Sequence, residues 1–164
     1  MPMKVSDLMT TEVVKVKETD PIARVRRILG GKDFHALPVV DDWDYLAGIV
    51  TCADFVDIQG DEARHPVKEV MQRRVYTVPE TVDVVLVARF MAKYHVRHLV
   101  IVRDGKVHGI LSSFDMLRAL TERDVPSGSG RGKAKQEDPR TELERLGLKF
   151  VDTLSSSDGG EPCH

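Results

Sequence analysis

The chain carries one pattern of apolar and polar residues twice, displaced by 62 positions. The segment beginning at Val5 aligns with the segment beginning at Val67, and both continue into apolar residues spaced three and four apart. That spacing is typical of one face of a helix. The matched pairs are Val5 and Val67, Met9 and Met71, Val13 and Val75, Val16 and Val78, Ile22 and Val84, Val25 and Val87, and Leu29 and Met91.

Four short apolar runs follow the helical patterns, two in each copy. The runs 37–40 and 99–102 keep the displacement of 62, and the runs 46–50 and 107–111 are displaced by 61. The difference arises because "DDWDYLAG" is one residue longer than "RDGKVHG", as a hairpin loop can be. The runs therefore predict two hairpins of two strands each.

Polar residues before each helical pattern indicate where the helices begin. Thr19 and Thr81 precede the first helix of each copy, and Thr51 and Ser112 precede the second, so we expect these side chains to cap them. Gly30-Gly31 is expected to end the first helix early in copy one, since glycine is a frequent helix terminator. Each copy therefore reads as β-α-β-β-α.

The repeat predicts an α+β (α/β) fold of two units followed by a tail. Residues 5–62 form repeat 1, residues 63–121 form repeat 2, and residues 122–164 form a flexible linker and tail. A unit of about sixty residues is marginally stable alone. We therefore expect the two repeats to pack sheet to sheet around a shared core.

The last helix of each repeat begins with the same short motif. "GIVTCADF" places Asp54 three residues after Thr51, and "GILSSFDM" places Asp115 three residues after Ser112. A hydroxyl and a carboxylate at this spacing can satisfy the free backbone N–H groups of a helix start. The same groups suit a bound ligand with hydroxyls and phosphates, because a carboxylate accepts from a diol and a helix N-terminus favours anions.

These residues resemble the CBS domain family, in the tandem pair called a Bateman module that occurs in stand-alone CBS domain-containing proteins. The resemblance rests on the opening "VSDLMT", the strands "HALPVVDD" and "VRHLVIVRDG", and the two endings quoted above. It extends from about Val5 to Leu120. It implies a pseudo-twofold pair of repeats with two clefts, which in many members bind AMP, ADP, ATP or another adenosine compound.

The resemblance also implies roles for the motif residues. Asp54 and Asp115 would accept hydrogen bonds from ribose hydroxyls, with Thr51 and Ser112 near the phosphates. Helix capping remains the alternative role of each carboxylate.

Basic side chains before the second strand of each repeat contact phosphate in the family. The corresponding residues here are His35, Arg97 and His98, with Ala36 at the fourth position. Arg97 suits phosphate best, because its planar guanidinium makes charge-assisted bonds. The alternatives are a solvated arginine and hydrogen-bonded histidines.

The family recognises adenine through backbone groups of the first strand, which here lie around Val13 and Val75. The second repeat departs from the usual Met-Thr opening, with "MQRR" where the first has "MTTE". Arg73 and Arg74 are further candidates to reach phosphate or an acidic partner.

Composition narrows the class of function. The chain has 164 residues, of which 24 are basic and 26 acidic, for a net charge of −2. A general nucleic-acid binder would show a basic excess, so nucleic acid is an unlikely partner by composition. There is no apolar run long enough for a membrane span and no signal-peptide pattern, and we expect a cytoplasmic protein.

Cysteines and histidines do not form a ligand pattern. Cys52 and Cys163 make neither a disulfide framework nor a zinc spacing, and we expect Cys52 to be a small buried apolar residue. None of the six histidines belongs to an HExxH motif. We expect no metal site, no catalytic residue and no enzyme activity.

The tail changes in composition from Glu122 onward. "VPSGSGRGKAKQEDPR" is typical of a flexible linker. In "TELERLGLKFVDTL", Thr141 is a possible cap and Gly147 a stop, with leucines between them. The pattern favours a mostly disordered tail with one helical turn, and the alternative is a segment that docks on the module or on a partner.

We therefore expect a regulatory module that senses adenosine nucleotides, without a resident cofactor, and passes the result to an unidentified protein. The family's habit of pairing modules predicts a homodimer. The alternatives are a ligand-free scaffold for dimerisation or assembly and a nucleic-acid-associated CBS protein. The residues do not choose among AMP, ADP, ATP, S-adenosylmethionine, NAD and a cyclic dinucleotide, nor between one occupied cleft and two.

Overall fold

The structure, a computed structural model, describes residues 2–31, 34–58, 60–61, 64–121, 139–145 and 147–152. These residues form two compact units. The first-repeat unit comprises the described parts of Val14–Val75, Asp104–Val107 and Val151–His164. The second-repeat unit comprises those of Met1–Val13, Tyr76–Arg103 and His108–Phe150.

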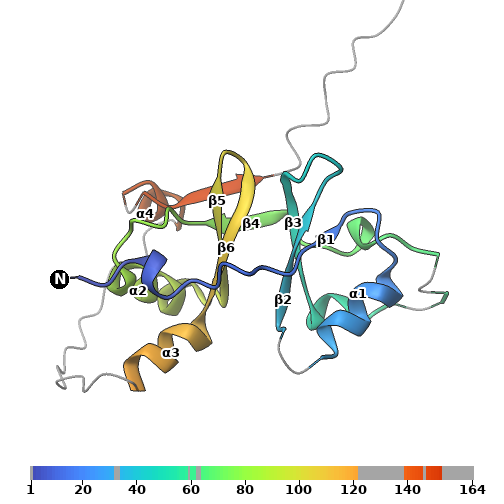
Figure 1. The fold of residues 1–164 in the computed structure, drawn as a ribbon, viewed down its shortest axis with the longest axis horizontal. Coiled ribbons are helices and arrows are strands. Elements are labelled where there is room, and N and C mark those ends of the chain that lie inside the picture. The colour runs from blue at the N-terminus through green and yellow to red at the C-terminus, as the bar shows by residue number, and fades with distance from the viewer. Residues whose placement is uncertain are drawn as a thin grey trace, which may run out of the picture. The chain divides into compact units, whose positions relative to one another are not determined.

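The first-repeat unit contains a three-stranded sheet (Figure 1). The sheet order is β1-β2-β3, with β1 parallel to β2 and β2 antiparallel to β3. A helix, α1, and two 3₁₀ turns complete the unit. The elements are β1 Val16–Lys17, α1 Ile22–Leu29, β2 Ala36–Val40, β3 Leu46–Thr51, η2 Cys52–Phe55 and η3 Val67–Glu69.

The sheet of the second-repeat unit has the order β6-β5-β4-β7. Its strand β4 is parallel to β5, and the first two residues of β4, Arg74 and Val75, are grouped with the first-repeat unit. The elements are η1 Val5–Asp7, β4 Arg74–Thr77, α2 Val84–Tyr94, β5 His98–Arg103, β6 Lys106–Ser112, α3 Ser113–Thr121, α4 Pro139–Arg145 and β7 Lys149–Asp152.

The apolar pattern predicts the core correctly. The three predicted face residues of α1 are buried in one core, and the three of α2 are buried in the other. The strands of both hairpins form where the apolar runs lie. The confirmed helix-face residues are Ile22, Val25, Leu29, Val84, Val87 and Met91.

The opening segment of each repeat belongs to the unit formed by the other repeat. Val5 is buried in the core of the second-repeat unit, whereas Val67 and Met71 are buried in the core of the first-repeat unit. Each segment then forms a two-bond backbone bridge to a hairpin strand. Thr10 exchanges N–H···O bonds of 2.9 and 3.1 Å with Ile110 of β6, and Gln72 exchanges bonds of 2.8 and 2.9 Å with Ile49 of β3.

A glycine in each hairpin lets the opening segment of the other repeat approach the strand. A Cβ on Gly48 would lie 2.7 Å from Met71 Sδ and 2.8 Å from the Gln72 carbonyl oxygen. We expect Gly48→Ala to destabilise the protein by about 1–3 kcal/mol, because a bridged carbonyl cannot move away without breaking the bridge. Urea unfolding measures the change, and the matched variant is Gly109→Ala, whose Cβ would meet the Thr10 carbonyl oxygen only at 3.3 Å. An equal or larger loss for Gly109→Ala would contradict this account.

Two predicted helix caps are wrong. The residue that caps α1 is Pro21, and the residue that caps α2 is Asp83, whose side chain accepts a hydrogen bond of 2.7 Å from the Val85 N–H. Thr19 and Thr81 each stand two residues earlier. Aspartate is at least as good a cap as threonine, and proline sets the φ with which a helix can begin.

The two repeats differ in the length of their helices. As predicted, α1 ends at Leu29 with Gly30 as its cap, while α2 continues to Tyr94. The helix predicted after Thr51 is wrong in extent, because only the 3₁₀ turn η2 forms there. Val56, Asp57, Ile58 and Gly60 follow that turn, and all have lower helix propensity than the leucine, arginine and alanine in the same part of α3.

Residues 139–145 and 147–150 belong to the second-repeat unit, and the prediction of a mostly disordered segment is wrong for this part of the tail. Helix α4 starts at Pro139, so Thr141 lies inside it and is not its cap. Gly147 ends the helix turn as predicted, with φ of 68°. Leu143 and Leu148 are only 3% and 2% exposed in the core, and β7 joins the sheet beside β4 (Figure 1). Residues 122–138 and 153–164, with Cys163, lie outside the described residues.

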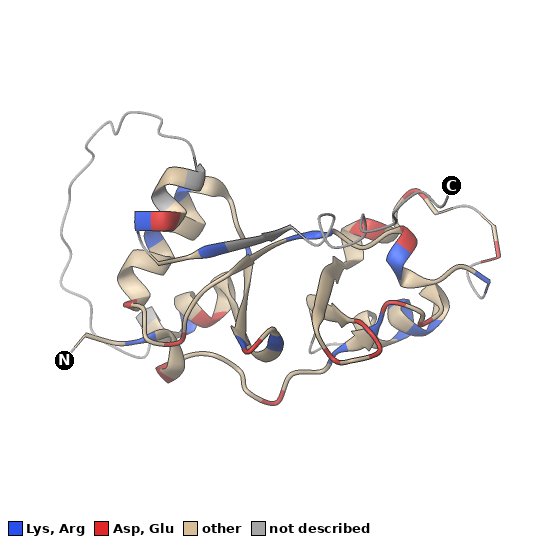
Figure 2. Ribbon diagram, turned by 90° about the horizontal axis from the view of Figure 1, so that it is seen from above, with Lys and Arg blue, Asp and Glu red and all other residues tan. Residues whose placement is uncertain are grey.

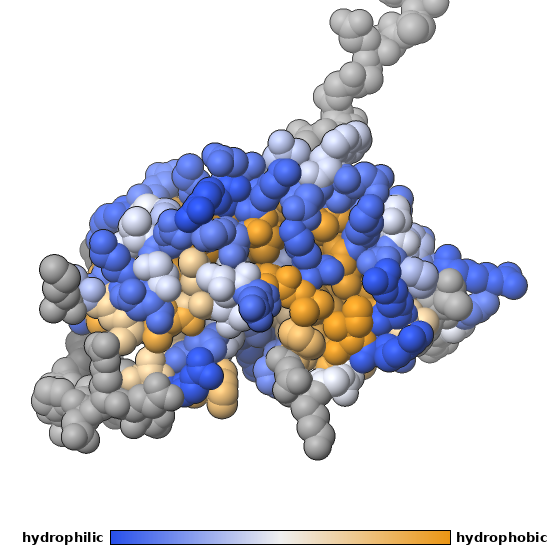
Figure 3. All heavy atoms as spheres, in the orientation of Figure 1, coloured by the Kyte–Doolittle hydropathy of each residue, from blue (hydrophilic) through white to orange (hydrophobic). Residues whose placement is uncertain are grey.

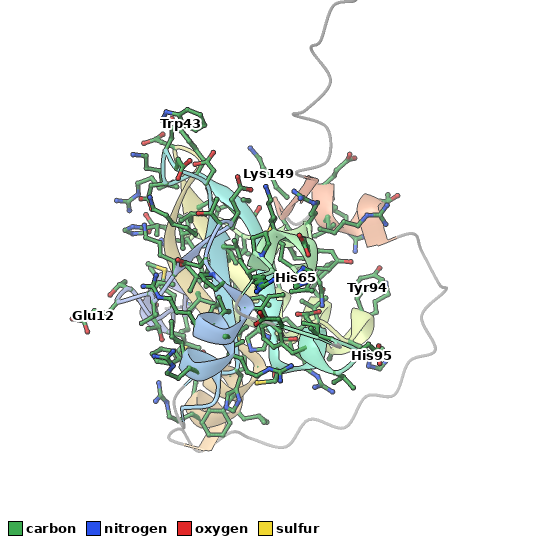
Figure 4. All side chains as sticks on the ribbon, turned by 90° about the vertical axis from the view of Figure 1, so that its right-hand side faces the viewer. Glu12, Trp43, His65, Tyr94, His95 and Lys149 are labelled. Carbon is green, nitrogen blue, oxygen red and sulfur yellow. The ribbon has the colours of Figure 1, made fainter. Side chains whose placement is uncertain are left out.

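The two hairpin loops differ as the one-residue offset predicts. Asp104 and Gly105 both have positive φ, which is typical of a two-residue hairpin turn. The longer loop is held by Asp41, whose Oδ1 accepts from the N–H groups of Trp43 and Tyr45 at 2.9 Å. Trp43 projects from its tip and is 75% exposed (Figure 4). A hydrogen bond of 2.7 Å from Lys15 Nζ lowers the pKa of Asp44 in the same loop.

Candidate functional sites

The carboxylate of Asp54 caps the turn that follows β3. Its Oδ2 accepts hydrogen bonds from the Thr51 N–H at 2.6 Å and from Thr51 Oγ1 at 3.0 Å. Both residues are half-buried. The predicted pairing of Thr51 with Asp54 is therefore present, and it uses one of the two carboxylate oxygens for the cap.

Asp115 repeats this arrangement at the start of α3. Its Oδ2 accepts from the Ser112 N–H at 2.8 Å and from Ser112 Oγ at 2.6 Å, and the Asp115 N–H donates to Ser112 Oγ at 3.2 Å. Among the described residues, Arg118 forms an ion pair with Asp115, its Nη2 lying 3.8 Å from Oδ1, beyond direct hydrogen-bond distance. In the described part of the chain, capping thus engages Oδ2, and Oδ1 has the Arg118 ion pair without a hydrogen bond.

The two sites differ in what surrounds the second carboxylate oxygen. Gln72 Nε2 donates a hydrogen bond of 2.9 Å to Asp54 Oδ1. At the corresponding place in the second-repeat unit the chain has Thr10, which has the same backbone bridge and a shorter side chain. The sequence marks the departure from Met-Thr at this position. The sequence does not reveal that Gln72 contacts Asp54. Gln72 belongs to the opening segment of repeat 2, and that segment packs in the first-repeat unit.

The basic candidates lie beside the two motifs. Ala36 pairs with Thr51 across β2 and β3, so the exposed His35 stands just beyond the Thr51 end of the hairpin. The Arg97 carbonyl accepts a hydrogen bond of 2.9 Å from the Ser113 N–H, which places exposed Arg97 at the start of α3. His98 is half-buried as the first residue of β5.

The two candidates for adenine recognition belong to different units. Val75 is buried in β4 and clusters with the first-repeat unit, whereas half-buried Val13 clusters with the second-repeat unit. The structure therefore groups the nine candidates into two sets. One set is His35, Thr51, Asp54 and Val75, and the other is Val13, Arg97, His98, Ser112 and Asp115.

The described residues also bear on metal binding, on membrane-spanning helices and on the exposure of Cys52. Among the described residues, no group of three or more His, Cys, Asp or Glu side chains could hold a metal ion. No helix there is both long and apolar enough to cross a membrane. Cys52, expected to be buried, is exposed, because it lies on the 3₁₀ turn with its sulfur 3.9 Å from the Leu29 carbonyl.

Comparison with protein families identifies the class of protein. The CBS domain model matches residues 5–61 and again residues 67–122. The chain therefore belongs to the CBS domain family, with two copies of the domain. The mixed α+β architecture with two small sheets is that of a CBS domain pair, so the predicted fold class is confirmed.

Curated relatives share the pair within proteins of different length. An uncharacterized 17.7 kDa protein of Acidianus ambivalens is 32% identical over 124 residues, which are 74% of this chain and 76% of that protein. Protein MJ1004 of Methanocaldococcus jannaschii is 30% identical over 123 residues, which are 73% of this chain but 58% of that protein. A homoserine O-acetyltransferase of Methanocorpusculum labreanum is 33% identical over 114 residues, 68% of this chain and only 23% of its own length.

Solved structures show the same fold. The CBS domain pair of protein MJ0100, in complex with 5′-methylthioadenosine and S-adenosylmethionine, has a TM-score of 0.66 and 28% identity. The match covers 74% of this chain and 98% of that chain. The crystal structure of MJ1004 has a TM-score of 0.67 and 29% identity, covering 73% and 60% of the two chains.

Proposed function

We propose that this protein is a regulatory module that binds adenosine compounds through Asp54 and Asp115, with AMP, ADP and ATP as the nucleotides of first choice. The observation that carries the proposal is the duplicated carboxylate, held at both repeats by the same bonds from the preceding hydroxyl residue. A carboxylate oxygen left over from capping can accept from ribose hydroxyls. The MJ0100 pair, which shares 28% of its aligned residues, was solved with two adenosine compounds.

Binding of the ligand would be communicated to a protein partner in the cytoplasm. The chain itself would catalyse no reaction. Basic and acidic residues are interspersed along the described chain (Figure 2), which supports a small-molecule ligand over nucleic acid. A scaffold that binds no ligand is the competing function. Its discriminator is whether any adenosine compound stabilises the protein.

A thermal-shift panel on the full chain tests the proposed function. The panel contains AMP, ADP, ATP, adenosine, 5′-methylthioadenosine, S-adenosylmethionine, NAD and a cyclic dinucleotide. A ligand at about a hundred times its Kd adds roughly 2.7 kcal/mol of stability. At least one adenosine compound should raise the melting temperature at millimolar concentration. No shift with any of them would favour the scaffold function.

A homodimer is part of this proposal. Helices α2 and α3 are in contact and carry four exposed apolar side chains, at Val85, Leu86, Phe114 and Leu117. Residues of high hydropathy also reach the surface on the face drawn in Figure 3. Burying such side chains against a second copy would be favourable. We expect Phe114→Asp with Leu117→Asp to give a monomer in light scattering, and a persistent dimer would place the interface elsewhere.

Arg97 is expected to give the second-repeat unit its preference for phosphate. Its planar guanidinium has five N–H donors in a fork that matches a phosphate, whereas the imidazole of the histidine at the matched place, His35, has at most two donors. Arg97→Ala should therefore weaken the binding of AMP and ATP by about 1.5–3 kcal/mol, while the binding of adenosine changes little. Calorimetric titrations at two salt concentrations measure this difference. Arg27→Ala, an exposed arginine on α1, is the control for loss of one charge.

Equal losses for adenosine and AMP would contradict the phosphate role of Arg97. That result would mean that the Arg97 side chain supports the fold around the start of α3 and does not contact phosphate. It would leave the helix start and its backbone N–H groups as the anion site.

A further inference from the structure

The side chain of Gln72 occupies the part of Asp54 that a ribose would use. Asp54 Oδ2 is already bonded to the Thr51 N–H and hydroxyl, and Gln72 Nε2 donates to Oδ1 at 2.9 Å. Both oxygens of this carboxylate therefore have donors from the chain itself. At Asp115, capping engages Oδ2, and the Arg118 guanidinium stands 3.8 Å from Oδ1.

The backbone holds Gln72 in this position. Its N–H and carbonyl exchange bonds of 2.8 and 2.9 Å with Ile49, and the neighbouring Met71 is buried against Gly48. Only the side-chain torsions of Gln72 are left to be ordered when its amide bonds Asp54. The entropic cost of that bond is accordingly small.

The second-repeat unit provides the matched case without the amide. Thr10 exchanges the same pair of backbone bonds with Ile110, and Met9 lies against Gly109 as Met71 lies against Gly48. The backbone bridge and the methionine contact are alike in the two units. Thr10 and Gln72 differ in side-chain length and in hydrogen-bonding groups. A threonine side chain is two heavy atoms shorter than glutamine and has no amide.

We propose that Gln72 is a specificity-determining residue that masks Asp54, so that the Ser112–Asp115 site binds adenosine compounds more tightly than the Thr51–Asp54 site. The inference rests on the proposed function. A ribose hydroxyl entering at Asp54 replaces one uncharged donor by another and gains little. The same hydroxyl at Asp115 adds a new bond to a charged acceptor, which corresponds to an affinity difference of about tenfold or more.

The test exchanges the two residues in the full chain and measures binding of AMP, ATP and adenosine by calorimetry. Asp115→Asn isolates the Asp54 site, and Asp54→Asn isolates the Asp115 site. In the Asp115→Asn protein, Gln72→Thr should tighten binding about tenfold. In the Asp54→Asn protein, Thr10→Gln should weaken it by a similar factor. Circular dichroism and melting curves verify that each variant is folded.

The outcomes separate this inference from the proposed function. If the wild-type protein binds but Gln72→Thr leaves the Asp54 site unchanged or weaker, Gln72 is not a mask, and a weaker site would make its amide a ligand contact. Failure of Thr10→Gln to weaken the Asp115 site would overturn the inference as well. If the wild-type protein and all variants bind none of the compounds, the proposed function itself is wrong and the inference falls with it.

Discussion

Asp115→Asn is expected to abolish most of the affinity of the second-repeat unit for adenosine compounds, while the fold is retained. The asparagine oxygen can still accept from the Ser112 N–H and hydroxyl, which donate to a single carboxylate oxygen at 2.8 and 2.6 Å. The other oxygen becomes an NH₂ group, which cannot accept from a ribose hydroxyl. The loss should be about 1–3 kcal/mol, or roughly five- to 150-fold in Kd.

Calorimetry on Asp115→Asn, Asp54→Asn and the double variant measures this loss. The control is Asp57→Asn, which changes an exposed aspartate close to η2 and outside both motifs. Affinities of the double variant equal to those of the wild type would show that the two carboxylates only cap η2 and α3. The ribose assignment would then be wrong, although the capping geometry would stand.

Removal of residues 122–164 is expected to destabilise the second-repeat unit substantially. Leu143 and Leu148 lie in its core, and their backbones are joined by a bond of 2.8 Å. The buried Thr77 donates its hydroxyl hydrogen to the Lys149 carbonyl at 2.9 Å, and β7 covers the edge of β4. Truncation exposes the apolar surface that these two leucines cover.

Single substitutions give the magnitude of this effect. Leu148→Ala and Leu143→Ala should each lower the free energy of unfolding by about 2–5 kcal/mol, the usual cost of a buried leucine. Val56→Ala is the control, because Val56 is 78% exposed and should change stability by no more than about 0.5 kcal/mol. Urea unfolding provides the measurement. An unchanged midpoint for both leucine variants would mean that α4 and β7 do not contribute to the core in solution.

The tail shows why part of the fold could not be predicted from the sequence. The sequence predicts a stop at Gly147, and the residue adopts the positive φ that glycine tolerates. The sequence does not mark the start of α4, because Pro139 follows a charged, glycine-rich stretch that is typical of a linker. A short helix and a four-residue strand have little stability of their own. Their order comes from the core and the sheet edge that they contact.

The hydroxyl and carboxylate groups of the candidate sites could be predicted from the sequence, but not every residue that contacts them. The hydroxyl-acid pairs Thr51–Asp54 and Ser112–Asp115 form as predicted, since a three-residue spacing at a helix start is a local property. Gln72 lies 18 residues from Asp54 and was not predicted to contact it. Its position depends on the bridge to Ile49, which no local pattern specifies.

By itself the sequence determined most elements of the two repeats, because periods of 2 and 3.6 decide which residues of a segment can share a buried face. It therefore also determined the hairpins, the buried faces of α1 and α2, and the position of the two capping carboxylates. Only the tertiary structure decided where the segments at Val5 and Val67 pack, which edge β7 covers and which side chain reaches Asp54. Those contacts join residues far apart in the chain, and their free energy comes from burial and backbone pairing that exist only once both partners are folded.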